Sequence, residues 1–491
     1  MLFNSADYVL FLPLVLLVYV LLRRVGLRAQ NAWMLIASYV FYGWWDWRFL
    51  GLLFGTTLND YLVGLGLERT EKQSTRRLLI LLSIGVNLGV LGFFKYYNFF
   101  VASFIEAFAG IGVHLEAPTL KVILPVGISF YTFQALTYTI SVYQRQMRAV
   151  HDPIGFFAYV AFFPQLVAGP IERARHLLPQ FFVPRVMEPE AFASGLRQML
   201  WGFFCKLVVA DNCATVVNSI FAQHAIPSGE ALSGSMALLG SVLFAFQIYA
   251  DFSGYSHIAL GTARLFGFEL MQNFATPYFS QNHPEFWRRW HISLSSWFRD
   301  YVYIPLGGNR TSKPRQAFNL LVTFTLSGLW HGANWTFIVW GILNGLYVIP
   351  RVFIGEPLAR AASSRNWLVR VPTVTFRILL TFSLTVLAWV FFRSPTIAGA
   401  WKVLGEIASR SLFTSPLPTL RSMGLLTTVV YAMLAITFLL VMEWWQRDKR
   451  YALELGERAA LLTWPACATV FAVIIFFRYT GASLDFIYFQ F

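Results

Sequence analysis

Hydrophobic runs and short polar segments alternate along most of the chain. The runs approach about 20 residues, the length that an α-helix needs to cross the hydrocarbon core of a bilayer. Several are short or interrupted by Gly and Pro, so the pattern predicts about 10 to 13 membrane crossings, with broken segments that re-enter the bundle or line a cavity. The runs are residues 6–22, 31–50, 51–67, 78–94, 96–113, 121–143, 154–170, 196–220, 233–255, 318–328 with 334–353, 374–392, 423–444 and 461–478.

Residues 269–316 break this pattern, because they are polar, basic and aromatic between two apolar runs. Pro284 marks the start of an expected helix, and no helix-breaking residue follows it closely. One face of this helix carries two arginines, a histidine and a serine, spaced three, four and four residues apart: Arg288, His291, Ser295 and Arg299. We expect the segment to be interfacial or re-entrant and not to span the membrane.

The composition supports a membrane protein. Of the 491 residues, 57% are hydrophobic and only 13% are charged, with a mean hydropathy of +0.57. Soluble proteins carry about 25% charged residues. We therefore expect one all-α polytopic membrane domain over residues 1–491, in which 318–353 is the membrane segment that bears His331. No small-residue cleavage site follows the first run, which predicts a retained helix rather than a signal peptide.

The formal net charge is +14. In a soluble protein this excess would suggest a nucleic-acid partner. Here the basic residues lie mainly between apolar runs, as in the cytoplasmic loops of membrane proteins, so we expect the lipid bilayer and no nucleic acid as a partner. The three cysteines show no metal-ligand spacing, and no metal site is expected.

His331 has the most informative position of the polar residues, because no charged residue occurs from Phe318 through Ile349. An ionisable group at membrane depth suggests a function. Imidazole titrates near neutral pH and is the usual general base for a hydroxyl acceptor. The alternative is a neutral histidine that is hydrogen-bonded to a helix carbonyl.

Small or polar residues flank His331: Ser327, Gly328, Gly332 and Asn334. Ser327 suggests a nucleophile-and-base pair, although such a serine more often bonds to its own helix. The glycines leave room for a ligand or for a close helix crossing. The chain contains no Gly-x-Ser-x-Gly, Walker A, His-Glu-x-x-His or Asp-x-Asp motif, which argues against serine hydrolases, ATPases, zinc proteases and metal-dependent glycosyltransferases.

Charged residues near the apolar runs suggest two further contacts. Arg288 and Arg299 suit a phosphate-bearing ligand, because guanidinium binds phosphate through paired hydrogen bonds. Contact with lipid headgroups is the alternative. Asp251 is the only acid between Glu230 and Glu269, and we expect it to form an ion pair with an arginine or a histidine across the bundle.

Two long motifs, FWRRWHISLSSWFRDYVYIPLGGNR (286–310) and GLWHGANWTFIVWG (328–341), resemble the membrane-bound O-acyltransferase family. The resemblance is to its bacterial branch for exopolysaccharide acetylation, best known from alginate O-acetylation. It implies a bundle of helices around a central tunnel. Shorter matching pieces extend it over the whole chain: 11–19, 36–45, 124–143, 162–171, 251–261 and 486–491.

The resemblance places the family's catalytic histidine at His331 and its second characteristic polar position at His291. Asn334 or His291 is expected to stabilise the oxyanion of the reaction. The residues expected to support the cavity are Asn334, Asp251, Tyr255 and Asp300. The residues expected to hold the phosphates of coenzyme A are Arg288, Arg289 and Arg299.

The resemblance implies an O-acyltransferase that takes an acetyl group from acetyl-CoA on the cytoplasmic side and needs no tightly bound cofactor. The acyl group would pass to a polysaccharide, or to a separate periplasmic or anchored partner protein, from the bacterial inner membrane. Two positions depart from the family pattern: His257 replaces the usual Asp, and FATPYF (274–279) replaces the commoner Asn-x-Pro-Tyr form. The alternatives are a transporter or flippase, which also uses broken helices and mid-membrane polar residues, or a non-catalytic scaffold of a polysaccharide-secretion complex.

Overall fold

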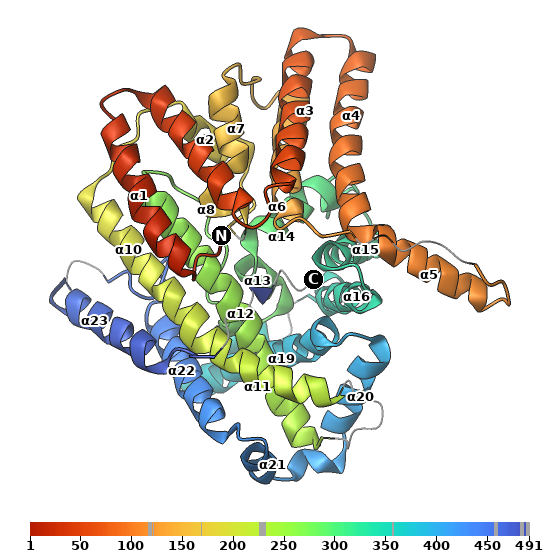
Figure 1. The fold of residues 1–491 in the computed structure, drawn as a ribbon. Coiled ribbons are helices and arrows are strands. Elements are labelled where there is room, and N and C mark those ends of the chain that lie inside the picture. The colour runs from red at the N-terminus through yellow and green to blue at the C-terminus, as the bar shows by residue number, and fades with distance from the viewer. Residues whose placement is uncertain are drawn as a thin grey trace. The chain divides into compact units, whose positions relative to one another are not determined.

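The computed structural model describes residues 1–491 except 116–119, 121, 168, 225–231, 356–357, 456–459, 482–485 and 488–491. All regular structure in these residues is helical, as expected for an all-α membrane protein (Figure 1). They form two compact units: Met1–Met199 with Ile258–Met271, and Leu200–His257 with Gln272–Phe491. The expectation of one domain stays a prediction, and most of the terminal motif 486–491 lies outside the described residues.

The first unit is built mainly from the N-terminal helices, drawn from red to yellow in Figure 1. They are α1 (Ala6–Leu22), α2 (Leu27–Gly43), α3 (Phe49–Arg69), α4 (Gln73–Leu91), η1 (Gly92–Tyr96), α5 (Tyr97–Ala109), α6 (Ile128–Tyr143), α7 (Pro153–Ala161), α8 (Phe163–Leu166), α9 (Ala174–Leu177) and η2 (Leu178–Phe181). Helix α3 packs against α4 and α6. A buried polar cluster joins α3 to α4, where the Asp60 carboxylate accepts hydrogen bonds from Ser83 at 2.6 Å and Asn87 at 2.9 Å.

The second unit contains the remaining helices, and α10 and α12 extend into both units. They are α10 (Pro189–Phe203), η3 (Phe204–Ala210), α11 (Asp211–His224), α12 (Gly234–Leu265), η4 (Pro277–Phe279), α13 (His283–Arg289), α14 (Ile292–Phe298), η5 (Arg299–Tyr303), α15 (Lys313–His331), α16 (Trp335–Val348), α17 (Pro350–Ile354), α18 (Ala359–Ala362), α19 (Trp367–Arg393), α20 (Ile397–Ile407), η6 (Arg410–Phe413), α21 (Leu417–Ser422), α22 (Leu426–Trp445) and α23 (Ala460–Phe477). Helix α16 packs against both α15 and α19.

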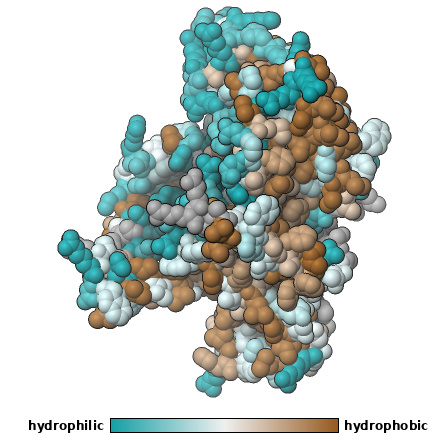
Figure 2. All heavy atoms as spheres, turned by 90° about the vertical axis from the view of Figure 1, so that its left-hand side faces the viewer, coloured by the Kyte–Doolittle hydropathy of each residue, from teal (hydrophilic) through white to brown (hydrophobic). Residues whose placement is uncertain are grey.

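Seven helical segments of the described chain are long and apolar enough to cross a membrane, and the protein is a multi-pass membrane protein. They are Phe49–Arg69, Gln73–Ala109, Pro189–Gln223, Gly234–Leu265, Trp335–Ile354, Trp367–Arg393 and Leu426–Trp445. Three shorter apolar helices accompany them: Ala6–Leu22, Pro153–Leu166 and Leu461–Phe477. Broad apolar areas occupy part of the face drawn in Figure 2, beside separate hydrophilic areas.

Two predicted spans are arranged differently in the structure. The runs 78–94 and 96–113 belong largely to one helical segment of 37 residues, Gln73–Ala109, which continues through the π-helical η1. The segment 318–353 contains most of α15 and then α16 with α17, and of these only the combined segment Trp335–Ile354 is long and apolar enough to cross. The first, α15, starts among polar residues and ends at His331.

Glycines set the close approach of α15 and α16. A Cβ atom on Gly328 would lie 2.2 Å from the carbonyl oxygen of Phe337, and one on Gly341 would lie 2.4 Å from the carbonyl oxygen of Phe324. Side chains at these positions would therefore force the helices apart. Of the two sequence-based interpretations of Gly328, the structure supports the close helix crossing.

We predict that Gly328→Ala destabilises the protein by at least about 2 kcal/mol, because the added methyl group overlaps a backbone carbonyl that cannot move independently. The control is Gly85→Ala in α4, where nothing lies within 4 Å of the new Cβ and alanine favours the helix. The measurement is the thermal unfolding midpoint of each purified variant in detergent. Equal midpoints for the two variants would contradict the close packing of α15 on α16.

Candidate active site

His331 lies at the turn between two packed helices. It is the last residue of α15, and α16 begins at Trp335 after an extended Gly332. The side chain of Asn334 caps α16 by accepting a hydrogen bond from the Thr336 backbone N–H at 3.0 Å. The hairpin thus fixes the position of an imidazole that is only 2% exposed.

Aromatic rings surround the His331 imidazole. The ring centroids of Trp330 and Trp340 lie 5.0 Å away, and that of Phe392 on α19 lies 5.4 Å away. The imidazole of His291 is also close, with its ring centroid 6.2 Å from that of His331. The environment of His331 is therefore apolar on several sides and faces a second imidazole.

His291 occupies a break between two helices. Helix α13 ends at Arg289, Trp290 is extended, and His291 has the left-handed φ of 42° before α14 begins. The prediction of one continuous helix from Pro284 was therefore wrong. Such a conformation is uncommon for a residue other than glycine and is strained unless its surroundings impose it.

Backbone pairing with an upstream segment imposes this break. The N–H of Ile292 donates to the carbonyl of Asn273 at 2.9 Å, and the N–H of Ala275 donates to the carbonyl of Arg289 at 2.9 Å. The hydroxyl of Ser293 also donates to the Asn273 side chain at 2.9 Å. No glycine or proline marks the break in the sequence. The break depends on these hydrogen bonds to a distant segment, which the local sequence pattern does not reveal.

Burial keeps His291 neutral. Its side chain is fully buried, with its ring 4.6 Å from that of Phe252. Burial lowers the pKa of His291 from its ordinary value of 6.5 to about 3. A neutral imidazole offers one N–H donor and cannot serve as a charged acid at neutral pH.

A cavity of about 700 Å³ opens beside this pair of histidines. Its wall includes three of the four residues expected on one face: Arg288, Ser295 and Arg299. Ser327, one turn before His331 on α15, also lines it, as does Trp287, whose ring lies 5.8 Å from that of Trp340. His291 and His331 are not among the lining residues, although Ile292 and Ser327, which are close to them in the chain, do line the cavity.

The three candidate donor-binding arginines have different surroundings. Arg288 is exposed and lines the cavity. Arg299 also lines it and pairs with Asp300 at 2.8 Å. Arg289 lies outside the lining and pairs with Glu285 at 2.9 Å. Arg288 is therefore the arginine best placed to bind a ligand in this cavity.

Asp251 takes part in a buried ion cluster. Lys206 Nζ lies 3.0 Å from Asp251 and 2.8 Å from Asp211, and the backbone N–H of Ile487 donates to Asp251 at 2.7 Å. The expected ion pair exists, but its partner is the only lysine in the run 196–220 and not an arginine or a histidine. The ring of Tyr255 lies 6.0 Å from this Lys206 nitrogen.

The contacts of Asn334 are structural. Besides capping α16, its side-chain amide donates to the Pro395 carbonyl at 3.0 Å. Both polar groups of the side chain are therefore engaged, and Asn334 is not among the cavity-lining residues. Its predicted role in supporting the cavity stays a prediction.

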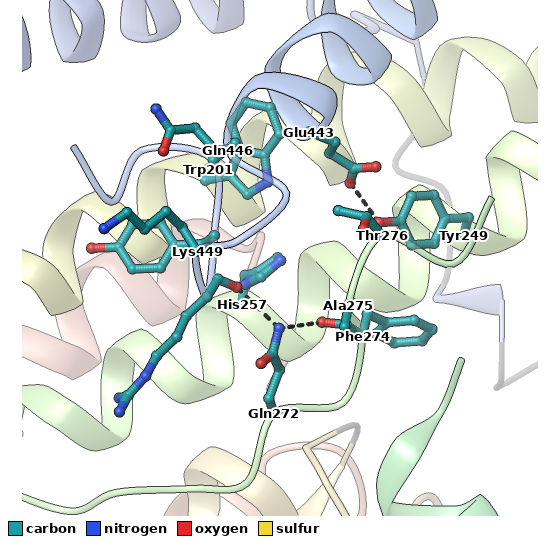
Figure 3. A pocket seen from close by; sticks show the side chains of 13 residues that line it. Trp201, Tyr249, His257, Gln272, Phe274, Ala275, Thr276, Glu443, Gln446 and Lys449 are labelled. Carbon is teal, nitrogen blue, oxygen red and sulfur yellow. Dashed lines mark hydrogen bonds between the residues drawn. The ribbon is translucent and has the colours of Figure 1, made fainter. Parts of the chain in front are cut away.

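A second, much smaller cavity of about 20 Å³, room for one water molecule, is lined by Tyr249 and Glu443, which the sequence analysis did not single out (Figure 3). The hydroxyl of Tyr249 donates to the buried carboxylate of Glu443 at 2.5 Å. His257, which departs from the family pattern, lines the same cavity, and Gln272 bridges the carbonyls of Phe274 and Arg450. Glu443 is the only acid in the apolar run 423–444, and this isolated charge is the sequence feature that could have indicated a buried polar site.

Comparisons with known proteins agree with these motifs. Residues 120–386 match the membrane-bound O-acyltransferase family, MBOAT. The chain is 42% identical to the probable alginate O-acetylase AlgI of Pseudomonas aeruginosa over 82% of the chain and 74% of that protein. It is 36% identical to the peptidoglycan O-acetyltransferase of Helicobacter pylori over 82% and 79%, and 29% identical to the teichoic acid D-alanyltransferase of Streptococcus thermophilus over 51% and 63%.

We predict that the stability of the protein falls as the pH drops from about 6.5 toward 3, in part because of His291. Its pKa is about 3 in the folded state, so the unfolded chain binds a proton in this range and the folded protein does not. The measurement is the thermal unfolding midpoint at pH 7.5 and pH 5. The difference between the two midpoints should be smaller in His291→Gln.

The control is His151→Gln, which removes an exposed histidine. An unchanged pH dependence in His291→Gln would contradict the burial of a neutral imidazole at the helix break.

Proposed function

Because the chain belongs to the membrane-bound O-acyltransferase family, we propose that it moves acetyl groups from acetyl-CoA for the O-acetylation of an exopolysaccharide such as alginate. The chain is an O-acyltransferase. Five relatives at 38–42% identity are named as probable alginate O-acetylases, which supports alginate or a similar exopolysaccharide as the polymer that is acetylated. The observation that carries the mechanism is the buried, aromatic setting of His331 one turn from a large cavity.

In this proposal His331 is the general base. Its unprotonated nitrogen takes the proton from the acceptor hydroxyl while the hydroxyl oxygen attacks the thioester carbonyl. The carbon–sulfur bond of the tetrahedral intermediate then breaks, and the imidazolium returns the proton to the leaving thiolate, which becomes the free thiol of coenzyme A. The hairpin of α15 and α16 holds the ring in place, which spares the reaction the entropy of orienting it.

His291 is proposed to stabilise the oxyanion. Attack on the carbonyl creates a negatively charged oxygen that needs a fixed hydrogen-bond donor in a water-poor site. A neutral imidazole supplies such a donor without giving up a proton, and burial keeps His291 neutral. Its backbone is anchored on both sides of the break, so the donor is pre-oriented.

The large cavity is proposed to bind the donor. Its volume of about 700 Å³ lies within the range of about 300–1,000 Å³ that is typical of small-molecule sites. Arg288 and Arg299 line it and would bind the phosphates of coenzyme A. Ser327 lines the cavity one turn before His331, so the thioester would approach the imidazole along α15.

The acceptor of the acetyl group is proposed to be a separate molecule outside this chain. We propose that the acetyl group leaves on the outer side of the bacterial inner membrane, to the polymer or to a hydroxyl of a periplasmic or anchored partner protein. One relative is named a probable alginate O-acetylase and another a peptidoglycan O-acetyltransferase, which supports a polymer as the final acceptor.

We predict that His331→Ala abolishes polymer acetylation in cells while the protein stays folded in the membrane. Loss of a general base reduces the rate by about 100-fold to 10,000-fold. The measurement is the acetyl content of the secreted polymer in a deletion strain that expresses each variant at the same level. His151→Ala, an exposed histidine, is the matched control, and normal acetylation by His331→Ala would overturn the assignment.

We also predict that Arg288→Gln raises the KM for acetyl-CoA by about ten-fold or more, because one charge-assisted contact to phosphate is lost. The neighbouring change Arg289→Gln should have a smaller effect on KM, because that guanidinium already pairs with Glu285. The measurement is the initial rate of coenzyme A release against acetyl-CoA concentration. Equal KM values for the two variants would contradict the proposal that acetyl-CoA binds in this cavity.

A further inference from the structure

A buried asparagine, Asn273, lies in the irregular segment between α12 and η4, beside the helix break at His291. Its side-chain Oδ1 accepts hydrogen bonds from the Ser293 hydroxyl at 2.9 Å and from the Ser293 backbone N–H at 3.4 Å. Its Nδ2 donates to the hydroxyl of Ser256 on α12 at 3.3 Å. One side chain, only 1% exposed, therefore joins two segments that are distant in sequence.

Both of these segments hold His291. Ser293 follows His291 by two residues, in the first turn of α14. Ser256 lies one turn after Phe252 on α12, and the ring of Phe252 packs edge-on against the His291 imidazole with the centroids 4.6 Å apart. The Asn273 side chain therefore connects the backbone that carries His291 to the helix that supplies one of its ring contacts.

The chemistry of these contacts requires an amide at position 273. A backbone N–H can only donate, so the atom that faces the Ser293 N–H must be an acceptor, and this leaves the amide nitrogen directed toward Ser256. An ionised carboxylate of the same shape has no donor, and an apolar side chain has neither group. Asparagine supplies both within one short side chain.

The side chain adds restraint to a break whose path the backbone already fixes. A residue other than glycine keeps a left-handed φ only where its surroundings impose it. The backbone pairs of Ile292 with Asn273 and of Ala275 with Arg289 do this, and they survive any change of the Asn273 side chain. The side-chain bonds therefore affect how precisely the His291 ring is held more than whether the break forms.

We propose that Asn273 is a positioning residue for acyl transfer, which holds the His291 imidazole in the orientation that stabilises the oxyanion. The inference rests on the proposed function of His291 as the oxyanion donor. The imidazole centroids of His291 and His331 lie 6.2 Å apart, so a small rotation of His291 moves its N–H out of reach of the reacting carbonyl. Asn273 does not line the 700 Å³ cavity, so its loss leaves the proposed contacts to acetyl-CoA in place.

The test uses inverted membrane vesicles from a deletion strain that expresses each full-length variant, because such vesicles keep the native acceptors and expose the cytoplasmic face. Incorporation of label from radiolabelled acetyl-CoA is measured against its concentration, which gives kcat and KM separately. The variants are Asn273→Ala, His291→Phe and the double variant. The matched control is Asn212→Ala, a buried asparagine whose amide donates to the carbonyls of Val208 and Phe477.

Asn273→Ala should lose at least about ten-fold in kcat, because a small misplacement of a reacting group is costly in rate. Its KM for acetyl-CoA should stay close to that of the wild type, since the donor cavity is untouched. Asn212→Ala should keep both values close to those of the wild type. The thermal unfolding midpoint of each purified variant in detergent reports whether it is folded.

The double variant separates positioning from a general loss of structure. His291→Phe keeps an aromatic ring against Phe252 and removes the ring N–H. If Asn273 acts through that N–H, Asn273→Ala costs little more once the imidazole is gone, and the double variant should have the kcat of His291→Phe alone. Two independent effects would multiply instead.

A kcat of Asn273→Ala equal to that of Asn212→Ala overturns the proposal, as does a double variant whose loss is the product of the two single losses. Wild-type transfer by His291→Phe contradicts the oxyanion role itself, so the two failures are distinguishable. If Asn273→Ala does not fold, Ser293→Ala takes its place in every comparison. It removes the hydroxyl and keeps the backbone N–H, and its expected loss in kcat is about five-fold.

Discussion

The cost of removing polar groups from water is the constraint on which the rest of this structure depends. Inside an apolar helical bundle each buried polar group needs a hydrogen-bond or ion-pair partner, because no water is available to it. Lys206 lies between two carboxylates, and Asp60 accepts bonds from Ser83 and Asn87. These pairings are among the buried polar contacts that connect segments of the chain, as are the hydrogen bonds of Tyr8 to Thr262 and of Tyr249 to Glu443.

His331 is buried among aromatic rings. The rings of Trp330, Trp340 and Phe392 lie around it, and the imidazole of His291 lies 6.2 Å away. Two local devices bring these imidazoles together: a hairpin whose helices touch through Gly328 and Gly341, and a break that holds His291 in a left-handed conformation. The site is thus built from backbone geometry, and only then from side-chain chemistry. A rigid, water-poor pair of this kind is suited to acyl transfer, in which a base and an oxyanion donor must be placed in advance.

The sequence predicted the class of fold and the buried position of His331, because both depend on local signals. Hydrophobic run length indicates membrane helices, and the apolar runs on both sides of His331 indicate that its imidazole is buried. The break at His291 was not predictable, because it depends on bonds to residues 273 and 275 and no breaking residue marks it. The partner of Asp251 was missed for a similar reason, since Lys206 is 45 residues away in the chain. The transporter interpretation, which the sequence left open, is replaced by the family match.

The most direct test of the central claim is a single-turnover measurement with purified protein, radiolabelled acetyl-CoA and a hydroxyl acceptor. His331→Gln should keep the affinity of the wild type for acetyl-CoA and lose at least about 100-fold in the rate of acetyl transfer, because it keeps the shape of the site and removes the base. A transfer rate equal to that of the wild type would contradict the assignment of His331 as the base.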